Sequence, residues 1–337
     1  MSATDRRPPT FEDVLAARER IKGRAVVTPL IRHPALDERT GGRILLKAET
    51  LQRVGAFKFR GAYNAVSRVD AKRYPGGVVA CSSGNHAQGV AAAATMCGLA
   101  SLIVMPADAP PLKIARTKAF GAEVVLFDRV KDDRDAIARE QCARRGAALV
   151  HPFDDPHVMA GQGTVGLELM EQAEALGLAP DAVLVCCSGG GLASGVSLAV
   201  KHARAATDVY TVEPAGFDKF ARSLASGRRE KNARLAGSIC DALMSPLAGE
   251  LTLEVGRRTM AGGVSVTDDE VRDAMRFAFT ELKLVVEPGG AAALAAVLAA
   301  KIPIKGRTVA AVLSGGNADP AQFAQIIDAA SAGRPQT

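Results

Sequence analysis

Hydrophobic positions along this chain follow two different periods, which alternate with one another. A helical period is clear over residues 11–21 and, with many charges on one face, over 133–145. Short apolar runs typical of buried strands occupy residues 43–48, 78–81, 101–105, 123–127, 182–187, 209–213 and 308–313. Further helices are expected over residues 86–97, 113–120, 192–203, 268–282 and 291–300. This alternation predicts an α/β fold with mostly parallel sheets flanked by helices.

The length and the turn signals favour two lobes. The chain has 337 residues, 48% of them hydrophobic and 23% charged, which is ordinary globular composition and enough for two cores. Segments 75–77 and 151–156 have the composition of crossings between lobes. We therefore expect a small domain over residues 73–152, inserted in a large domain built from residues 1–72 and 153–330.

Composition and charge argue against several classes of function. The net charge of +6 comes from scattered basic residues, and with no Trp and only 3 Tyr the chain lacks stacking platforms for nucleic acids. The six cysteines show no C-x-x-C spacing, which favours free thiols in a reducing compartment. The first residues carry no apolar signal segment, and the apolar run 291–300 is too short to span a bilayer. We expect a soluble cytoplasmic protein that binds small, mildly anionic ligands rather than nucleic acid or membranes.

One lysine has unusual neighbours. Lys58 stands between Phe57 and Phe59, shortly after Gly55. Apolar walls disfavour the ammonium form and lower the pKa of a lysine, which prepares the amine to form a Schiff base. The alternative interpretation is a lysine whose stem lies on apolar surface with its charge in water.

Three short polar segments follow expected strands. The sequence SGGGLASG at 188–195 offers convergent backbone N–H groups at the start of a helix, which is typical of a phosphate-binding loop. It has neither Walker nor dinucleotide spacing. The sequence SSGNHAQG at 82–89 groups hydroxyls and an amide without a carboxylate, which suits a substrate carboxylate. Ser314 opens the third segment. Each of these segments also has a simpler interpretation as a turn or a helix cap.

Together these segments resemble the serine/threonine dehydratase and serine racemase family of pyridoxal-phosphate enzymes, which has the two-lobed tryptophan-synthase-β-like fold (fold type II). The resemblance covers residues 10–325 and rests on an ordered set of motifs. They are QRVGAFKFRGA, SSGNHAQG, HPFDDPHVMAGQGT, SGGGLASG, VEP, KLVVEPGG and LSGGN.

The resemblance implies a role for each cofactor-binding residue. Lys58 would bind pyridoxal 5'-phosphate covalently and then act as the base at Cα, while Phe57 would lie against the pyridine ring. Asn85 would contact the phenolic oxygen of the cofactor, and Ser314 would hydrogen-bond the pyridine nitrogen. The phosphate would be bound by Ser188, Gly189, Gly190, Gly191 and Leu192.

The same resemblance assigns the substrate side. The carboxylate of the substrate would be bound by Ser82, Ser83, Asn85 and His86. Ser83 would also be a catalytic residue, since a hydroxyl opposite Lys58 can protonate the second face of Cα. The alternative is that Ser83 only binds the carboxylate or caps a helix.

The expected reaction is β-elimination of L-threonine or L-serine to a 2-oxo acid and ammonia. A serine at the ring nitrogen cannot keep that nitrogen protonated, so elimination is favoured over reactions that need a strong electron sink. Serine racemisation and dehydration of 3-hydroxyaspartate are the alternatives. A non-catalytic ligand-sensing relative is disfavoured by the intact lysine and phosphate loop.

Two expectations concern a metal and assembly. Glu213-Pro214 matches the start of a divalent-cation site (Mg²⁺ or Ca²⁺) in racemase-like members. Lys219 falls where the second acidic ligand would lie, with Asp218 one residue earlier, so a site formed by Glu213 and Asp218 is in doubt. The family also implies a homo-oligomer that acts on a small hydroxy amino acid.

Overall fold

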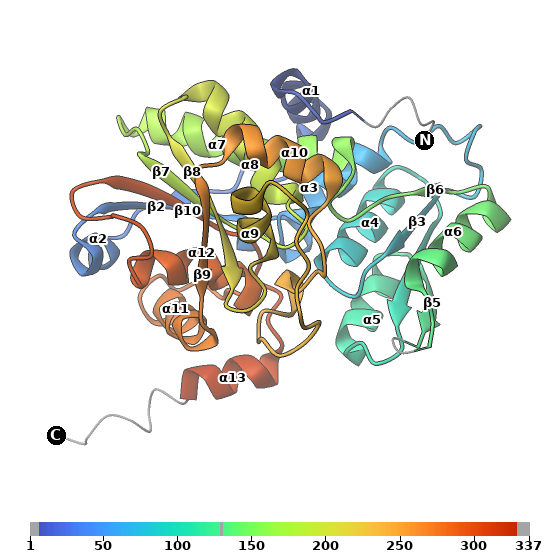
Figure 1. Cartoon of the computed structure of the whole chain (residues 1–337). Helices are drawn as coiled ribbons and strands as arrows, with labels where there is room; N and C mark the ends of the chain where they lie inside the picture. Colours follow the sequence, from blue (N-terminus) through green and yellow to red (C-terminus); the bar gives the residue numbers. More distant parts are fainter. Residues whose placement is uncertain (1–6, 129–130, 329–337) are drawn as a thin grey trace.

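The computed structural model describes residues 7–128 and 131–328 and contains two β-sheets (Figure 1). The larger sheet has the strand order β1-β2-β10-β7-β8-β9. Its strands run parallel except β1, which pairs antiparallel with β2. In this order the strands are β1 (Leu30–Ile31), β2 (Arg43–Ala48), β10 (Thr308–Leu313), β7 (Ala182–Cys186), β8 (Asp208–Pro214) and β9 (Gly262–Val266).

The smaller sheet lies within one continuous segment of the chain. Its order is β5-β4-β3-β6, and all of its pairs are parallel. The strands are β5 (Glu123–Phe127), β4 (Ser101–Pro106), β3 (Val78–Cys81) and β6 (Ala148–Leu149). Figure 1 shows this sheet with helices α4, α5 and α6 on one side of the molecule, beside the larger body.

Helices cover both sheets. They are α1 (Phe11–Ile21), α2 (Pro34–Thr40), α3 (Lys58–Val66), α4 (Asn85–Met96), α5 (Pro111–Ala119), α6 (Arg134–Arg145), α7 (Pro156–Ala175), α8 (Gly191–Ala203), α9 (Lys219–Ser226), α10 (Glu250–Thr259), α11 (Asp268–Thr280), α12 (Pro288–Leu298) and α13 (Pro320–Asp328). Three short 3-10 turns are η2 (Glu49–Leu51), η3 (Arg53–Gly55) and η4 (Asp241–Leu243).

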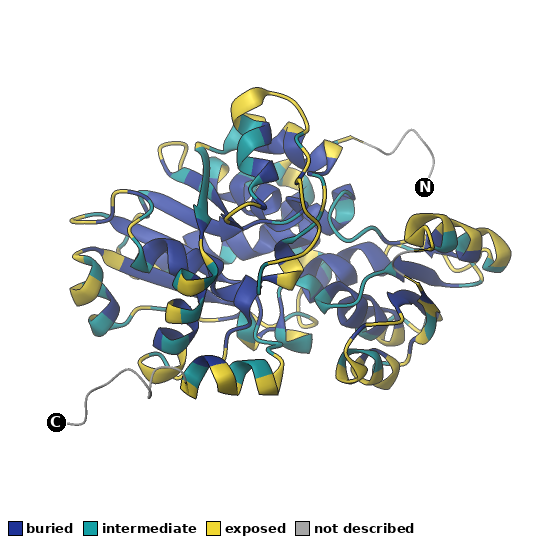
Figure 2. Ribbon diagram, turned by 60° about the horizontal axis from the view of Figure 1, so that its bottom comes forward, coloured by how far each residue is buried: buried dark blue, intermediate teal, exposed yellow. Residues whose placement is uncertain are grey.

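The central strands of the larger sheet are buried on both faces. Strands β7 and β10 have no exposed residue, because helices including α8 and α12 pack against the sheet. This explains their unbroken apolar sequences, which do not alternate with polar residues. Figure 2 shows the two sheets and the inner helices as buried and the outer helical faces as exposed.

The expected fold class is confirmed, and most expected strands match the observed ones closely. The long helix α7 was not expected, and segment 151–156 leads directly into it. Helix α3 packs against both α4 and α7, so it joins the two sheets through their helices. The domain boundaries at residues 72 and 152 stay a prediction.

The topology gathers the polar segments. Strands β2, β3, β7 and β10 each end just before one of the segments identified in the sequence. Ligands of α/β proteins bind beyond the carboxyl ends of parallel strands, so this edge is where a site is expected. Within residues 7–128 and 131–328, every helix is too short or too polar to cross a bilayer.

Candidate active site

Lys58 is the first residue of α3, and its side chain reaches towards the segment that joins the two sheets. Its Nζ donates a hydrogen bond to the carbonyl oxygen of Pro152 at 2.6 Å and lies 5.3 Å from the centre of the Phe57 ring. Helix α4 comes so close at Gly89 that a Cβ there would lie 3.3 Å from the backbone of Lys58. Burial lowers the pKa of Lys58 to about 8, so a useful fraction of the amine is neutral near pH 7–8.

The loop between β7 and α8, residues 188–193, presents a set of unpaired backbone N–H groups that we call the anion cradle. Among the described residues, no backbone N–H from 188 to 193 donates to an acceptor of the protein. These groups lie at the N-terminus of α8, where the helix dipole also favours negative charge. A phosphate group fits this donor set, and it would satisfy N–H groups that otherwise have only water.

Aromatic rings and one threonine hold this loop in shape. Gly190 has a φ of +100°, and a Cβ on it would collide with the Phe220 ring. A Cβ on Gly189 would collide with the Phe153 ring. The carbonyl oxygen of Gly189 accepts a hydrogen bond from Thr252 Oγ1 at 2.6 Å. Phe153 follows Pro152, so the same segment touches both Lys58 and the anion cradle.

The loop between β3 and α4 offers a second set of donors. The N–H groups of residues 83, 85, 86 and 87 have no acceptor within the part of the chain that the structure describes. Ser82 Oγ accepts a hydrogen bond from the N–H of Gly84 at 3.2 Å, whereas no described group bonds the Ser83 hydroxyl. The loop can therefore bind a carboxylate through backbone N–H groups and through Ser83.

The imidazole of His86 points away from these donors. Its Nε2 lies 3.1 Å from the carbonyl oxygen of Val150, and the ring is buried with Nδ1 lacking a partner in the described chain. Burial, and next the nearby Lys58 charge, lower the pKa of His86 to about 3, so the ring is neutral. Because Nε2 must donate to a carbonyl, Nδ1 is an acceptor and cannot bind a carboxylate. Of His86, only the backbone N–H can therefore make the expected contact with the substrate carboxylate.

Asn85 is the centre of a hydrogen-bond chain that joins the two sheets. Its Nδ2 donates to Glu287 Oε1 at 2.6 Å, and its Oδ1 accepts from Asn317 Nδ2 at 2.8 Å. Asn317 Nδ2 also donates to the carbonyl oxygen of Val54, a β-branched residue held at a φ of +56°. Burial raises the pKa of Glu287 to about 7. Glu287 and Asn317 lie in the motifs KLVVEPGG and LSGGN, and no role was assigned to Asn317 from the sequence.

Ser314 lies directly after β10 and is buried. Its carbonyl oxygen accepts the N–H of Phe57 at 3.0 Å, and its hydroxyl interacts with the Cys186 thiol. Ala56 and Gly315 form a bridge beside it. The lysine segment, the end of β7 and the end of β10 therefore meet at one place, as the shared edge of the sheet requires.

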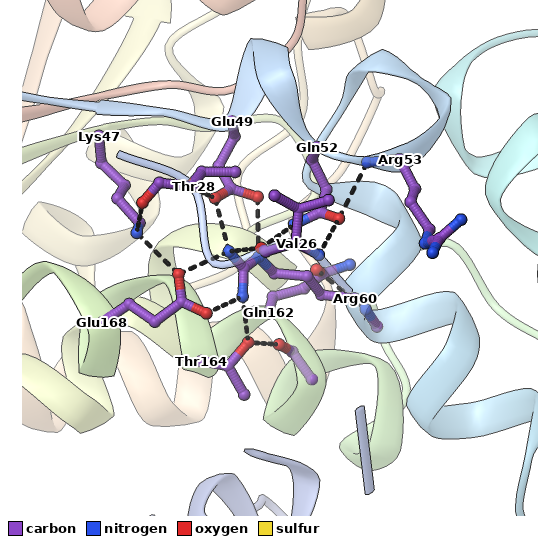
Figure 3. Close-up of polar contacts among 12 residues, drawn as sticks. Val26, Thr28, Lys47, Glu49, Gln52, Arg53, Arg60, Gln162, Thr164 and Glu168 are labelled. Carbon is purple, nitrogen blue, oxygen red and sulfur yellow. Dashed lines mark hydrogen bonds and ion pairs between the residues drawn. The ribbon is translucent and has the colours of Figure 1, made fainter. Parts of the chain in front are cut away.

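Behind Lys58, helix α3 is fixed by a buried charge network (Figure 3). The Arg60 guanidinium donates to both oxygens of Glu49 and both oxygens of Glu168, at 2.6–2.8 Å. Lys47 Nζ donates to Glu168 Oε2 at 2.7 Å. Arg60, Lys47 and Glu49 are all 0% exposed. Burial raises the pKa of Glu49, but Arg60, Thr28 and Lys47 together outweigh it, and the net shift is downward.

The expected cation site does not fit the structure. Glu213 is 0% exposed, and its Oε1 accepts a hydrogen bond from Lys219 Nζ at 2.9 Å. Asp218 instead faces Arg222, with Oδ1 3.2 Å from its Nε. Among the described residues, no group of three or more His, Cys, Asp or Glu side chains is placed to hold a metal ion. Hard cations need several oxygen ligands, and two positive side chains lie here instead.

Comparison with known proteins gives a consistent result. A family model described as pyridoxal-phosphate dependent enzyme matches residues 21–315, which include both sheets, Lys58 and both donor loops. Serine racemase of Schizosaccharomyces pombe is 38% identical over 319 residues, covering 95% of this chain and 97% of that protein. L-threo-3-hydroxyaspartate ammonia-lyase of Pseudomonas sp is 39% identical, covering 94% and 98%.

Among solved structures, a threonine deaminase from T.th. has a TM-score of 0.86 at 44% identity, covering 92% of this chain and 99% of that one. Its fold is the fold type II arrangement that the resemblance implied, and the donor set at 188–193 suits the phosphate of the cofactor. The chain therefore belongs to the family of pyridoxal-phosphate-dependent enzymes, among relatives named as ammonia-lyases and racemases.

Proposed function

We propose that this protein catalyses β-elimination on L-threonine and L-serine, giving a 2-oxo acid and ammonia. One observation carries the proposal: a lysine with a lowered pKa is bonded to Pro152, next to the Phe153 ring that packs against one set of unpaired backbone donors, and is approached by α4, whose first turn holds the other set. One set suits the phosphate of pyridoxal phosphate, and the other suits the carboxylate of an amino acid. The named relatives act on serine, threonine or 3-hydroxyaspartate, which share a hydroxyl on Cβ.

The chemistry divides between the cofactor and the chain. Pyridoxal phosphate, when bound, supplies the electrophilic ring that stabilises negative charge at Cα. Lys58 would bind it covalently and later accept the Cα proton, which its pKa of about 8 allows near neutral pH. The N–H groups of residues 83 and 85–87 would hold the substrate carboxylate and so orient the Cα–H bond towards Lys58.

The residues that would surround the pyridine ring of the cofactor favour loss of the substituent on Cβ of the substrate. Ser314 is a neutral hydroxyl that would contact the ring nitrogen without holding a proton on it. Phe57 would lie against the ring, and Asn85, fixed from both sides by Glu287 and Asn317, would contact the phenolic oxygen. With a weaker electron sink, the departure of the hydroxyl together with the Cα proton is the favoured outcome.

A substrate panel tests the proposal. L-serine, L-threonine, D-serine and L-threo-3-hydroxyaspartate are each incubated with the holoenzyme, and 2-oxo acid, ammonia and enantiomer composition are measured together. L-threonine and L-serine should give 2-oxobutanoate and pyruvate, with one ammonia per 2-oxo acid. Inversion of serine without any 2-oxo acid would contradict elimination and assign the chain to the racemases.

Racemisation is the second candidate, because the Ser83 hydroxyl has no described partner. A donor on the face of Cα opposite Lys58 would allow some D-serine turnover beside elimination. Ser83→Ala should then reduce D-serine turnover and L-to-D conversion at least tenfold more than L-threonine elimination. Ser82→Ala is the matched control and should change both reactions by similar factors. An equal loss of both reactions in Ser83→Ala would leave that residue a carboxylate contact only.

3-Hydroxyaspartate has a second carboxylate that needs its own counter-charge. Arg134, at the start of α6, is exposed, and its Nε lies 3.6 Å from Asp135 Oδ1. Another arginine, Arg116, donates to Asn317 Oδ1 at 3.4 Å. Threonine and serine remain the proposed substrates.

The pH dependence of cofactor capture follows from the pKa of Lys58. Only the neutral amine attacks the aldehyde, so the rate at which the apoenzyme turns yellow should rise with pH and level off above about pH 8. A solvated lysine analogue, with a pKa of about 10.4, should still gain rate up to pH 10. The measurement is the initial rate of absorbance increase at several pH values. If the rate of absorbance increase of the apoenzyme kept rising above pH 9, as the rate of the lysine analogue does, Lys58 would not be desolvated.

A further inference from the structure

Glu213 and Lys219 form an ion pair that is closed to solvent. Both side chains are 0% exposed. Glu213 Oε1 accepts from Lys219 Nζ at 2.9 Å and from the N–H of Phe220 at 3.1 Å, while Oε2 accepts from the N–H of Ala221 at 2.8 Å. The carboxylate therefore has three donors and a full compensating charge, all from the first turn of α9.

This pair lies directly behind the anion cradle. Glu213 is near the end of β8, which pairs with β7, and the N–H of Cys187 donates to Val212 at 2.8 Å just before the loop begins. Phe220, next to Lys219, is the ring that a Cβ on Gly190 would strike. The start of α9 thus sets the position of the ring on which the loop 188–193 rests.

We propose that the Lys219 ammonium is a tethered structural cation, which supports the phosphate loop in the place where a divalent metal would otherwise be needed. A buried carboxylate requires a positive partner, and this chain provides one covalently, six residues further on. Asp218, the other oxygen donor nearby, is turned to Arg222. The holoenzyme is consequently independent of divalent cations for its stability and its retention of cofactor.

The first test measures thermal unfolding and cofactor retention of the holoenzyme in EDTA, Mg²⁺ and Ca²⁺. Wild type should behave identically in all three conditions. Destabilisation of wild type by EDTA, reversed by Mg²⁺ or Ca²⁺, would overturn the proposal. Because both readouts are independent of substrate turnover, they do not depend on which amino acid the enzyme uses.

Substitutions at the pair sharpen the test. Lys219→Met leaves a buried carboxylate without its counter-charge, and the Tm should fall by roughly 5–10 °C. The double variant Glu213→Gln with Lys219→Met removes both charges and should recover most of that loss. A Lys219→Met protein as stable as wild type would overturn the role of the ammonium, as would a double variant less stable than Lys219→Met.

Lys219→Asp converts the pair into two carboxylates. Its Tm and cofactor retention should drop in EDTA and rise again with Mg²⁺ or Ca²⁺. Lys305→Asp makes the same change of charge at an exposed position of the larger body and should show no response to cations. A Lys219→Asp protein that is as stable in EDTA as wild type would contradict the need for a cation at this place.

Discussion

Lys58→Ala is expected to lower 2-oxo acid production by at least about 10³-fold, because one residue is proposed both to hold the cofactor and to move the Cα proton. Cofactor should still bind, more weakly and without a covalent link, since the donors at 188–193 are untouched. Turnover reports on catalysis, dialysis on non-covalent retention of the cofactor, and borohydride trapping on the covalent link to Lys58.

Lys118→Ala is the matched control for this variant, because Lys118 is exposed on α5. It should retain turnover, and borohydride should still attach the cofactor covalently to it. In wild type, the borohydride-reduced cofactor should map to Lys58. A label on another lysine, or near-normal turnover of Lys58→Ala, would refute the proposed role.

Arg60→Met should cost about 3–5 kcal/mol of unfolding free energy, because it leaves Glu49 and Glu168 buried or nearly so without their shared partner. Denaturant unfolding at neutral pH measures this loss. Arg18→Met breaks the exposed pair with Glu171 on α7 and should cost about 1 kcal/mol or less.

The effect of Arg60→Met should also depend on pH. In wild type the pKa of Glu49 is lowered on folding, so its contribution to stability is present above its unfolded pKa and is lost as the pH falls through its folded value. The difference in unfolding free energy between wild type and Arg60→Met should therefore become smaller as the pH is lowered. An equal loss of unfolding free energy in Arg60→Met and Arg18→Met would show that the buried charge network around Arg60 does not stabilise α3.

The sequence predicted those parts of the fold that repeat a local pattern. Strands at residues 43–48, 78–81, 123–127 and 308–313 were expected with the bounds that the structure has. Helix α7 was missed, because its residues are apolar on most sides and include Gly161, Gly163 and Gly166. Those glycines weaken a helix signal, yet here they allow close packing: a Cβ on Gly163 would crowd Val14, and one on Gly166 would crowd α8.

The sequence suggested candidate site residues only where a motif is contiguous. The lysine segment, the anion cradle and the carboxylate loop each lie within about ten residues of sequence. In contrast, the bond from Lys58 to Pro152 spans 94 residues, and that from Asn85 to Glu287 spans 202. No local period encodes such contacts. The same is true of the imidazole of His86, whose partner Val150 is 64 residues away.

The unpaired N–H groups of the loop 188–193 have a thermodynamic consequence for the protein before it receives its cofactor. A site that attracts anions only when folded makes stability a function of anion concentration. The gain is RT ln(1 + [L]/Kd), or about 2.7 kcal/mol when the free anion is at 100 times its dissociation constant. Inorganic phosphate should therefore raise the unfolding free energy of the apoprotein. Pyridoxal phosphate would then bind by displacing a phosphate ion from a loop that is already folded.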